Sequence, residues 1–503
     1  MRITFFVPLS LAALVSLGGS VLAIGSSDLM TAVKNHDREG VRLLVGKVDV
    51  NAPEPDGSTA LLWAAQSNDL ETVNLLLKAG ANPKTANRYG ATPLSTAATY
   101  AGKEVVETLL KAGADPEVRV SRSGQTVLMT ASRVGNAGAV KALLERGVDV
   151  NAKETDRGQT ALMWAAAEGH AEVVSLLMAH GADHKLRSVE RNTAGARLQS
   201  ATPVANVDRG GLTALMLAAR QGQGAATRAL VAGGADANQA DPDGNNALVL
   251  AVLNVHYDVA DLLLSLGADP NLGNKQGRTA LFTAVDIRNR DLSPLPARSE
   301  TDKLSSMDLI LSLLKHGANI NARLTAATPI SRSTNDPGDK TLAAGATPFM
   351  RAARSTDLPL MRVLLQHGAD PKLGNTDGLN SLMVAAGLTW TEKIHGTEAE
   401  ALETVKVLAD LGLDVNAATK AGDTALHGAA YRGADSIVRY LIEKGAKVNA
   451  ANTAGFTPLD IAMNKDHREG KPGVIRDSTA ALLSENGGKP GVRKAGVVNT
   501  DDE

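Results

Sequence analysis

The sequence predicts an all-α repeat solenoid built from about twelve helix-turn-helix units, and three observations carry that prediction. A glycine recurs at a nearly constant interval, with successive gaps of 33, 34, 34, 53, 33, 33, 68, 33, 44 and 33 residues. A variant of Thr-(Ala/Pro)-Leu follows each of these glycines, and a second glycine closes most units. A unit of this size cannot bury its apolar face alone, so the units must stack. The repeat glycines are Gly57, Gly90, Gly124, Gly158, Gly211, Gly244, Gly277, Gly345, Gly378, Gly422 and Gly455.

Each unit contains the signals for two helices. A threonine such as Thr59 can cap the first helix, and proline is tolerated in a first turn because its missing N–H would have no partner there. Small pairs such as Ala64-Ala65 follow and let neighbouring helices approach closely. The second helix has aliphatic residues at helical spacing. It ends at Gly-Ala-(Asp/Asn), where glycine takes a left-handed cap without strain.

The period of 33 residues and the Thr-(Ala/Pro)-Leu phrase resemble the ankyrin-repeat family across residues 25–486. A degenerate first unit fits residues 25–51. The resemblance implies stacked helix pairs joined by β-turn fingers, with function located on a surface. Ankyrin proteins are protein-binding scaffolds, so the resemblance also implies a protein partner.

Departures from the period locate loop insertions. We predict a solenoid over residues 24–486 with insertions at 184–209, 287–303, 322–343 and 388–398, and a flexible tail at 487–503. The insertions are rich in Ser, Thr, Ala, Pro and Gly, which is typical of exposed loops.

Residues 1–23 predict a secretory signal peptide. Arg2 is followed by an apolar stretch, and a small-x-small ending leads to Ala23 just before the first repeat. An uncleaved membrane anchor is the alternative, although the apolar core is shorter than the ~20 residues that a span needs. Cleavage would leave no membrane span. A signal of this kind on so long an array is similar to bacterial exported ankyrin proteins, so we expect a periplasmic or secreted protein.

The composition sets further limits. The formal net charge is −2, which gives no global indication of nucleic-acid binding. The chain has no cysteine, which is compatible with an oxidising compartment. We expect a monomer that needs no cofactor.

The histidines and methionines occupy repeat positions, which favours structural roles over catalysis or metal binding. His180, His316 and His367 precede a closing glycine, where the helix dipole favours a partly positive side chain. His427 stands where the family has a structural histidine. Methionine replaces that histidine in five units, either as core packing or as an adaptable binding face. No arrangement of nucleophile and base stands apart from the repeat, so we predict no catalytic, metal or cofactor site and no enzyme activity. The five methionines are Met129, Met163, Met216, Met350 and Met383.

One surface remains as a candidate binding site. In the ankyrin family, the residues nine and ten positions after the repeat glycine face the concave side and contact partners; we call them slot residues. Arginine and tyrosine are over-represented at interface hot spots, and the repeated arginines would favour an acidic partner. The alternative is a solvated face. The candidates are Gln66, Tyr100, Arg133, Glu168, Arg220, Gln221, Asn254, Arg354, Tyr431 and Arg432.

The sequence therefore predicts a non-catalytic scaffold for protein–protein interaction that is exported from the cytoplasm. Two alternatives stay open: an accessory or regulatory subunit of an exported enzyme, and a secreted effector that acts on a host.

Overall fold

A computed structural model describes residues 25–120, 123–190, 210–289, 302–326, 342, 344–389, 396–464 and 475–492. The chain divides into two compact units, Met1–Asn192 with Arg209–Asp236, and Thr193–Asp208 with Ala237–Glu503. The described part of the first unit is the N-terminal stack, and that of the second is the C-terminal stack. The predicted signal peptide at residues 1–23 lies outside the described residues.

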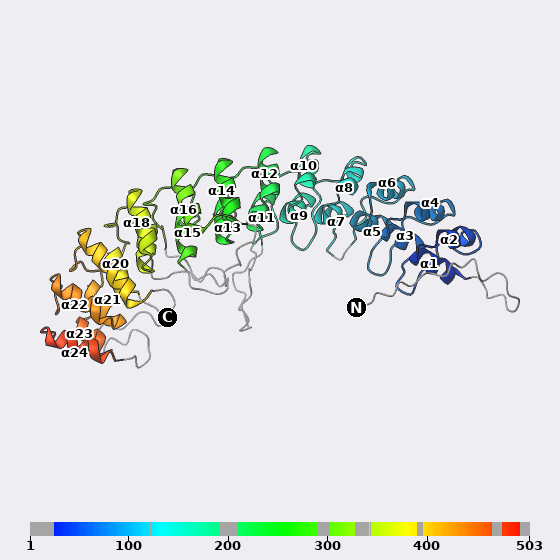
Figure 1. The fold of residues 1–503 in the computed structure, drawn as a ribbon. Helices are drawn as coiled ribbons and strands as arrows, with labels where there is room; N and C mark the ends of the chain where they lie inside the picture. The colour runs from blue at the N-terminus through cyan, green and yellow to red at the C-terminus, as the bar shows by residue number, and fades with distance from the viewer. Residues whose placement is uncertain are drawn as a thin grey trace, which may run out of the picture. The chain divides into compact units, whose positions relative to one another are not determined.

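The N-terminal stack consists of six helix pairs, coloured from blue to green in Figure 1. Each first helix packs against the second helix of its own pair and against the first helices of neighbouring repeats. The first helices are α1 (Ser26–Lys34), α3 (Ala60–Gln66), α5 (Pro93–Tyr100), α7 (Val127–Val134), α9 (Ala161–Ala167) and α11 (Ala214–Arg220). The second helices are α2 (Arg38–Leu44), α4 (Leu70–Lys78), α6 (Lys103–Lys111), α8 (Ala137–Leu144), α10 (Ala171–Ala179) and α12 (Gly224–Ala232).

The C-terminal stack repeats this arrangement in six further pairs, coloured from green to red in Figure 1. Its first helices are α13 (Ala247–Leu253), α15 (Ala280–Arg288), α17 (Pro348–Arg354), α19 (Ser381–Ala386), α21 (Ala425–Arg432) and α23 (Pro458–Ala462). Its second helices are α14 (Tyr257–Ser265), α16 (Ser306–Lys315), α18 (Leu358–Gln366), α20 (Glu398–Asp410), α22 (Asp435–Glu443) and α24 (Asp477–Glu485). The described residues thus form twelve helix pairs and no strand beyond isolated β-bridges, which confirms the predicted all-α repeat solenoid.

The helix boundaries have the predicted causes. The Thr59 hydroxyl accepts a hydrogen bond from the Leu62 backbone N–H at 3.4 Å. At the start of α9, the Thr160 hydroxyl accepts one from the Met163 backbone N–H at 3.3 Å. These bonds satisfy amide groups that have no partner inside the helix. Gly80, which follows the second helix α4, has a φ of 91°, in the left-handed region that glycine adopts without strain.

Small and aliphatic side chains form the core. Ala64 and Ala65 on α3, and Ala218 and Ala219 on α11, are buried. On the second helix α4, Val73 and Leu76 are buried in the same way as the pattern predicts. Cores of this kind are assembled between nearest neighbours along a stack.

An asparagine bridge links successive repeats, and the sequence pattern did not reveal it. Asn151 lies four residues after the closing glycine of its repeat. Its Nδ2 donates to the Gly181 carbonyl at 3.3 Å, and its Oδ1 accepts from the Asp183 N–H at 2.8 Å in the next finger. The same pair of bonds is made by Asn51, Asn238, Asn271, Asn321, Asn416 and Asn449.

Four repeats break this pattern. Glu117 occupies the asparagine position and accepts one bond, from the Asp149 N–H at 2.8 Å. Lys84, Lys185 and Lys372 occupy it in three others, and their side chains form no bridge among the described residues.

The described ends of the predicted insertions differ from simple loops. Helix α15 continues through Arg288, so Ile287 is helical and buried rather than part of a loop. Leu324 and Leu342 are also buried, and Leu324 pairs with Ala346 through a backbone bond of 3.0 Å. The central parts of the four insertions, at 191–209, 290–301, 327–341 and 390–395, lie outside the described residues.

The predicted flexible tail also begins in packed structure. The Gly487 carbonyl accepts from Asn449 at 2.9 Å, the Lys489 carbonyl accepts from Thr457 at 2.9 Å, and the Gly491 N–H donates to Asp460 at 2.7 Å. Residues 487–491 therefore form the start of another finger. The rest of the predicted tail, from residue 493, lies outside the described residues.

Candidate functional site

The histidines make structural hydrogen bonds in the described repeats. His427 is buried; its Nδ1 accepts from the Thr424 N–H at 3.1 Å, so Nε2 donates to the Phe456 carbonyl at 3.2 Å. His180, His316 and His367 lie at helix C-termini, as predicted. There the histidine Nδ1 lies 2.8–2.9 Å from the carbonyl oxygen four residues earlier, a contact that the sequence did not predict. Among the described residues, no group of three or more His, Asp or Glu side chains could hold a metal ion.

The five methionines belong to the core. Met129, Met163, Met216, Met350 and Met383 are all buried. Two of them replace the histidine directly, because the Thr126 N–H lies 3.4 Å from the Met129 sulfur and the Thr213 N–H lies 3.5 Å from the Met216 sulfur. A buried row of this kind cannot serve as an exposed binding face.

The slot residues of the N-terminal stack lie at the surface. Tyr100 is 63% exposed, and Gln66, Arg133, Glu168 and Gln221 are also exposed. Arg220 is half-buried. This surface, formed by the slot residues of the N-terminal stack, is the N-terminal slot face.

The slot residues of the C-terminal stack make internal contacts instead. Arg354 was expected at the surface but is only 1% exposed. Its Nε donates to the Thr389 hydroxyl at 3.1 Å and its Nη2 to the Thr389 carbonyl at 3.2 Å. Burial lowers the pKa of Arg354 to about 10, against the opposing effect of Asp286. The expectation failed because Thr389, just after α19, lies against this arginine.

The other three slot residues of the C-terminal stack also contact other residues of the chain. The Arg432 Nη2 donates to the Gly396 carbonyl at 2.6 Å, and burial lowers the pKa of Arg432. The Tyr431 ring lies under the Arg476 guanidinium, 5.1 Å from ring centre to Cζ. The Asn254 amide donates to the Leu250 carbonyl at 2.8 Å. The four slot arginines therefore do not form one basic row.

A buried ionic cluster lies in the C-terminal stack and was not found from the sequence. Asp286 of α15 accepts from Arg351 Nε at 2.7 Å through one carboxylate oxygen and from Arg278 through the other. Arg351 also donates to the Asn289 carbonyl at 3.2 Å. Both arginines are 2% exposed, so the cluster joins α15 to α17 inside the stack rather than presenting a charged surface.

Two cation–indole pairs lie in the N-terminal stack. Lys34 Nζ lies 4.4 Å from the ring centre of Trp63, and Arg133 Cζ lies 5.8 Å from that of Trp164. The Trp63 indole N–H donates to Glu54 at 2.7 Å.

Comparison with protein families identifies the repeat. The description "Ankyrin repeats (3 copies)" matches residues 29–120, 117–188, 196–274, 215–293 and 395–471, and "Ankyrin repeat" matches residues 344–373. The chain belongs to the ankyrin-repeat family. No curated protein matches this sequence.

Ankyrin repeats generally mediate protein–protein interaction, so the relevant site in such a stack is a surface. Of the two slot surfaces, the N-terminal one is open and the C-terminal one is largely occupied by the chain itself. No described helix is both long and apolar enough to cross a bilayer.

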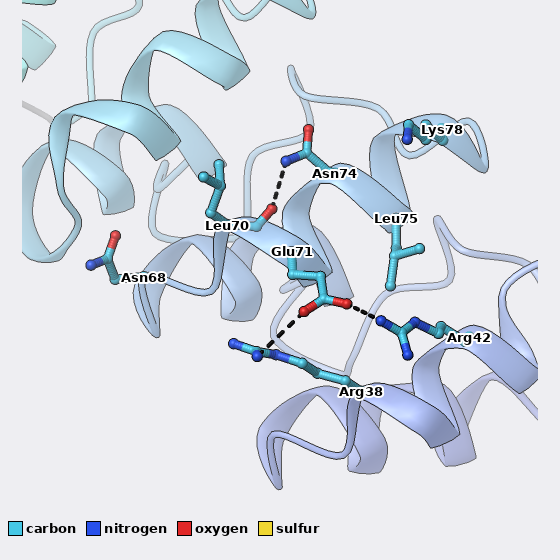
Figure 2. Close-up of a pocket in the computed structure, with 8 residues that line it drawn as sticks. All are labelled: Arg38, Arg42, Asn68, Leu70, Glu71, Asn74, Leu75 and Lys78. Atoms are coloured by element: carbon cyan, nitrogen blue, oxygen red, sulfur yellow. Dashed lines mark hydrogen bonds and ion pairs between the residues drawn. The ribbon is translucent and has the colours of Figure 1, made fainter.

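A hollow lies between α2 and α4 of the N-terminal stack (Figure 2). It has a volume of about 800 Å³. Glu71 lines it and pairs with Arg38 at 3.3 Å and with Arg42. Arg38 also binds Asp69 at 3.0 Å. Arg42 also pairs with Glu39 at 2.5 Å, so both arginines of the hollow already have carboxylate partners within the chain. The hollow is lined by Arg38, Arg42, Asn68, Leu70, Glu71, Asn74, Leu75 and Lys78.

Proposed function

We propose that this ankyrin-repeat chain is an exported, non-catalytic scaffold that binds a protein partner through its N-terminal slot face. The observation that carries the proposal is the contrast between the two stacks. Tyr100, Arg133 and Glu168 are exposed, whereas Arg354 and Arg432 at the corresponding positions bind the chain's own backbone.

The composition of the N-terminal slot face supports binding. Exposed tyrosine and arginine offer large contact area and hydrogen-bond donors, which is the chemistry of interface hot spots. Tyr100 and Val134 add exposed apolar surface next to these polar groups. The signal-like segment at residues 1–23 supports export.

Site-specific photocrosslinking tests the proposed face. A photoreactive amino acid is placed at position 100, 133 or 168 of the full chain, in cells that produce the protein. Ser175 and Lys141 provide matched controls, because both are exposed on second helices of the same stack. We expect discrete protein adducts from the three slot positions and none from the controls. Adducts only from the controls, or from no position, would refute the proposal.

A further inference from the structure

The two cation–indole pairs of the N-terminal stack occupy equivalent repeat positions. Lys34 and Arg133 each lie nine residues after a glycine, Gly25 and Gly124. Trp63 and Trp164 each lie six residues after the next repeat glycine. In both pairs the cation of one repeat lies over the indole of the next.

The first pair is closed by a carboxylate of the chain. Glu54 Oε1 lies 2.5 Å from Lys34 Nζ, and its Oε2 accepts from the Trp63 indole N–H at 2.7 Å. One carboxylate thus satisfies both donors. Hydrogen bonds that involve a charged group are stronger than neutral ones. A carboxylate that bridges a cation and the neighbouring indole N–H is therefore a stable arrangement.

The second pair has no such carboxylate. The indole N–H of Trp164 is buried and has no acceptor in the described part of the chain. The Arg133 side chain makes no hydrogen bond or ion pair there, and its contact is the Trp164 ring. Buried donors are nearly always satisfied in folded proteins, so an orphaned indole beside an exposed guanidinium needs an explanation.

The finger sequence explains why the chain does not supply the missing group. Glu154 follows Asn151 by three residues, as Glu54 follows Asn51, but the later finger has one residue more before its glycine. Glu154 is 4% exposed, and its carboxylate accepts from the backbone N–H groups of Asp156 at 2.7 Å, Arg157 at 2.8 Å and Gln159 at 3.0 Å. The Glu154 carboxylate is therefore already bound by the backbone of its own turn.

We infer that Arg133 and Trp164 form a receptor for a carboxylate of the protein partner, an Asp or Glu side chain that takes the place Glu54 holds in the first pair. This inference deepens the proposed function and rests on it. The guanidinium can bind a carboxylate through two parallel bonds, and the exposed Arg133 side chain can move aside to admit an oxygen to the indole N–H.

The surroundings restrict the partner's sequence. Tyr100 is exposed on α5, and Val134 is exposed next to Arg133. Glu168 is exposed four residues after Trp164, at the end of the same helix. Its negative charge disfavours a run of acids. The site therefore fits a single acidic residue flanked by apolar ones, rather than a polyacidic tract.

The test uses the full chain and synthetic probes. Fluorescein-labelled nine-residue peptide mixtures have apolar flanks and a fixed central Glu, Gln or Lys, and binding is followed by fluorescence anisotropy. Acetate is added as a competitor, to separate recognition of a peptide side chain from binding of any free carboxylate. We expect the Glu mixture to bind at least about tenfold more tightly than the Gln mixture, because a charged hydrogen-bonded pair is lost. Equal affinities, no measurable binding of the Glu mixture, or its full displacement by millimolar acetate would overturn the inference.

Two variants and their matched controls locate the site. Arg133→Gln removes the cation, and Trp164→Phe removes the indole N–H but keeps an aromatic ring; we expect about tenfold and several-fold weaker binding, respectively. Trp63→Phe makes the same change in the pair that Glu54 already closes, and Arg228→Gln removes an exposed arginine of α12. Both controls should bind like the unaltered chain. Should Trp164→Phe fail to fold, Arg133→Gln still decides, because its side chain is exposed.

The outcome separates this inference from the proposed function. Crosslinked adducts at position 100 with unchanged binding by Arg133→Gln would leave the scaffold function intact and refute the carboxylate receptor. An absence of adducts together with no peptide binding would refute both.

Discussion

Asp286→Asn is expected to destabilise the C-terminal stack strongly. The substitution keeps the shape of the side chain but removes the charge that Arg278 and Arg351 both contact. The carboxylate is 7% exposed and both guanidiniums are 2% exposed, so solvent screens these interactions little. Removing one partner of a buried ion pair costs about 3–5 kcal/mol, because the opposite charge stays buried. We expect the free energy of unfolding to fall by that amount.

A surface ion pair in the same stack provides the control. Lys406 and Glu403 lie 2.7 Å apart on α20, with side chains 40% and 58% exposed. Glu403→Gln makes the same change in charge, but an exposed pair contributes about 0–1 kcal/mol. Both variants are unfolded in urea and followed by circular dichroism, with hydrogen exchange of α15 and α17 to localise the effect. Equal losses from the two variants would refute the structural role of the buried cluster.

Three further outcomes are expected. Ala218→Leu should overpack α11 and cost about 1–3 kcal/mol, whereas the exposed Gln221→Ala should change the free energy of unfolding by about 0.5 kcal/mol; similar values in thermal melts would contradict the assignment of inner and outer positions. Burial alone would raise the pKa of Asp69, but hydrogen bonds from an arginine and a threonine outweigh it and lower that pKa. The ionised Asp69 therefore stabilises the fold above its unfolded pKa, and this stabilisation is lost as the pH falls through its folded pKa. Asp69→Asn should accordingly make the free energy of unfolding fall less steeply below about pH 4. The same fall in the variant and the unaltered chain would count against the pairing of Asp69 with Arg38. Finally, amino-terminal sequencing of the exported protein should begin at Ile24, and an intact amino terminus would exclude cleavage after Ala23.

The repeat signals predicted the fold well because they act locally. Glycine in a left-handed conformation, threonine as a helix cap and alanine between close helices are each set by a few neighbouring residues, so the period was enough to place twelve helix pairs. His427 and Met129 were also placed correctly, since their positions within the repeat decide their neighbours.

The contacts between distant residues could not be predicted in this way. Asp286 and Arg351 are 65 residues apart, and a lengthened repeat separates them. One signal was available: Arg351 stands six residues after its glycine, where other repeats have Trp63, Trp164 or Leu217. An arginine at a position where those repeats have uncharged residues indicates a partner of opposite charge. The exposure of Arg354 was predicted wrongly because Thr389, which contacts it, belongs to an irregular segment.

The asparagine bridges divide the array. Each is a two-bond clasp between adjacent repeats, and within the described parts of the chain the lysines at positions 84, 185 and 372 leave three junctions without one. Because each clasp adds two hydrogen bonds between neighbouring repeats, those three junctions have less hydrogen bonding between repeats than the clasped ones. One residue type in the fingers thus decides whether two neighbouring repeats share this pair of bonds.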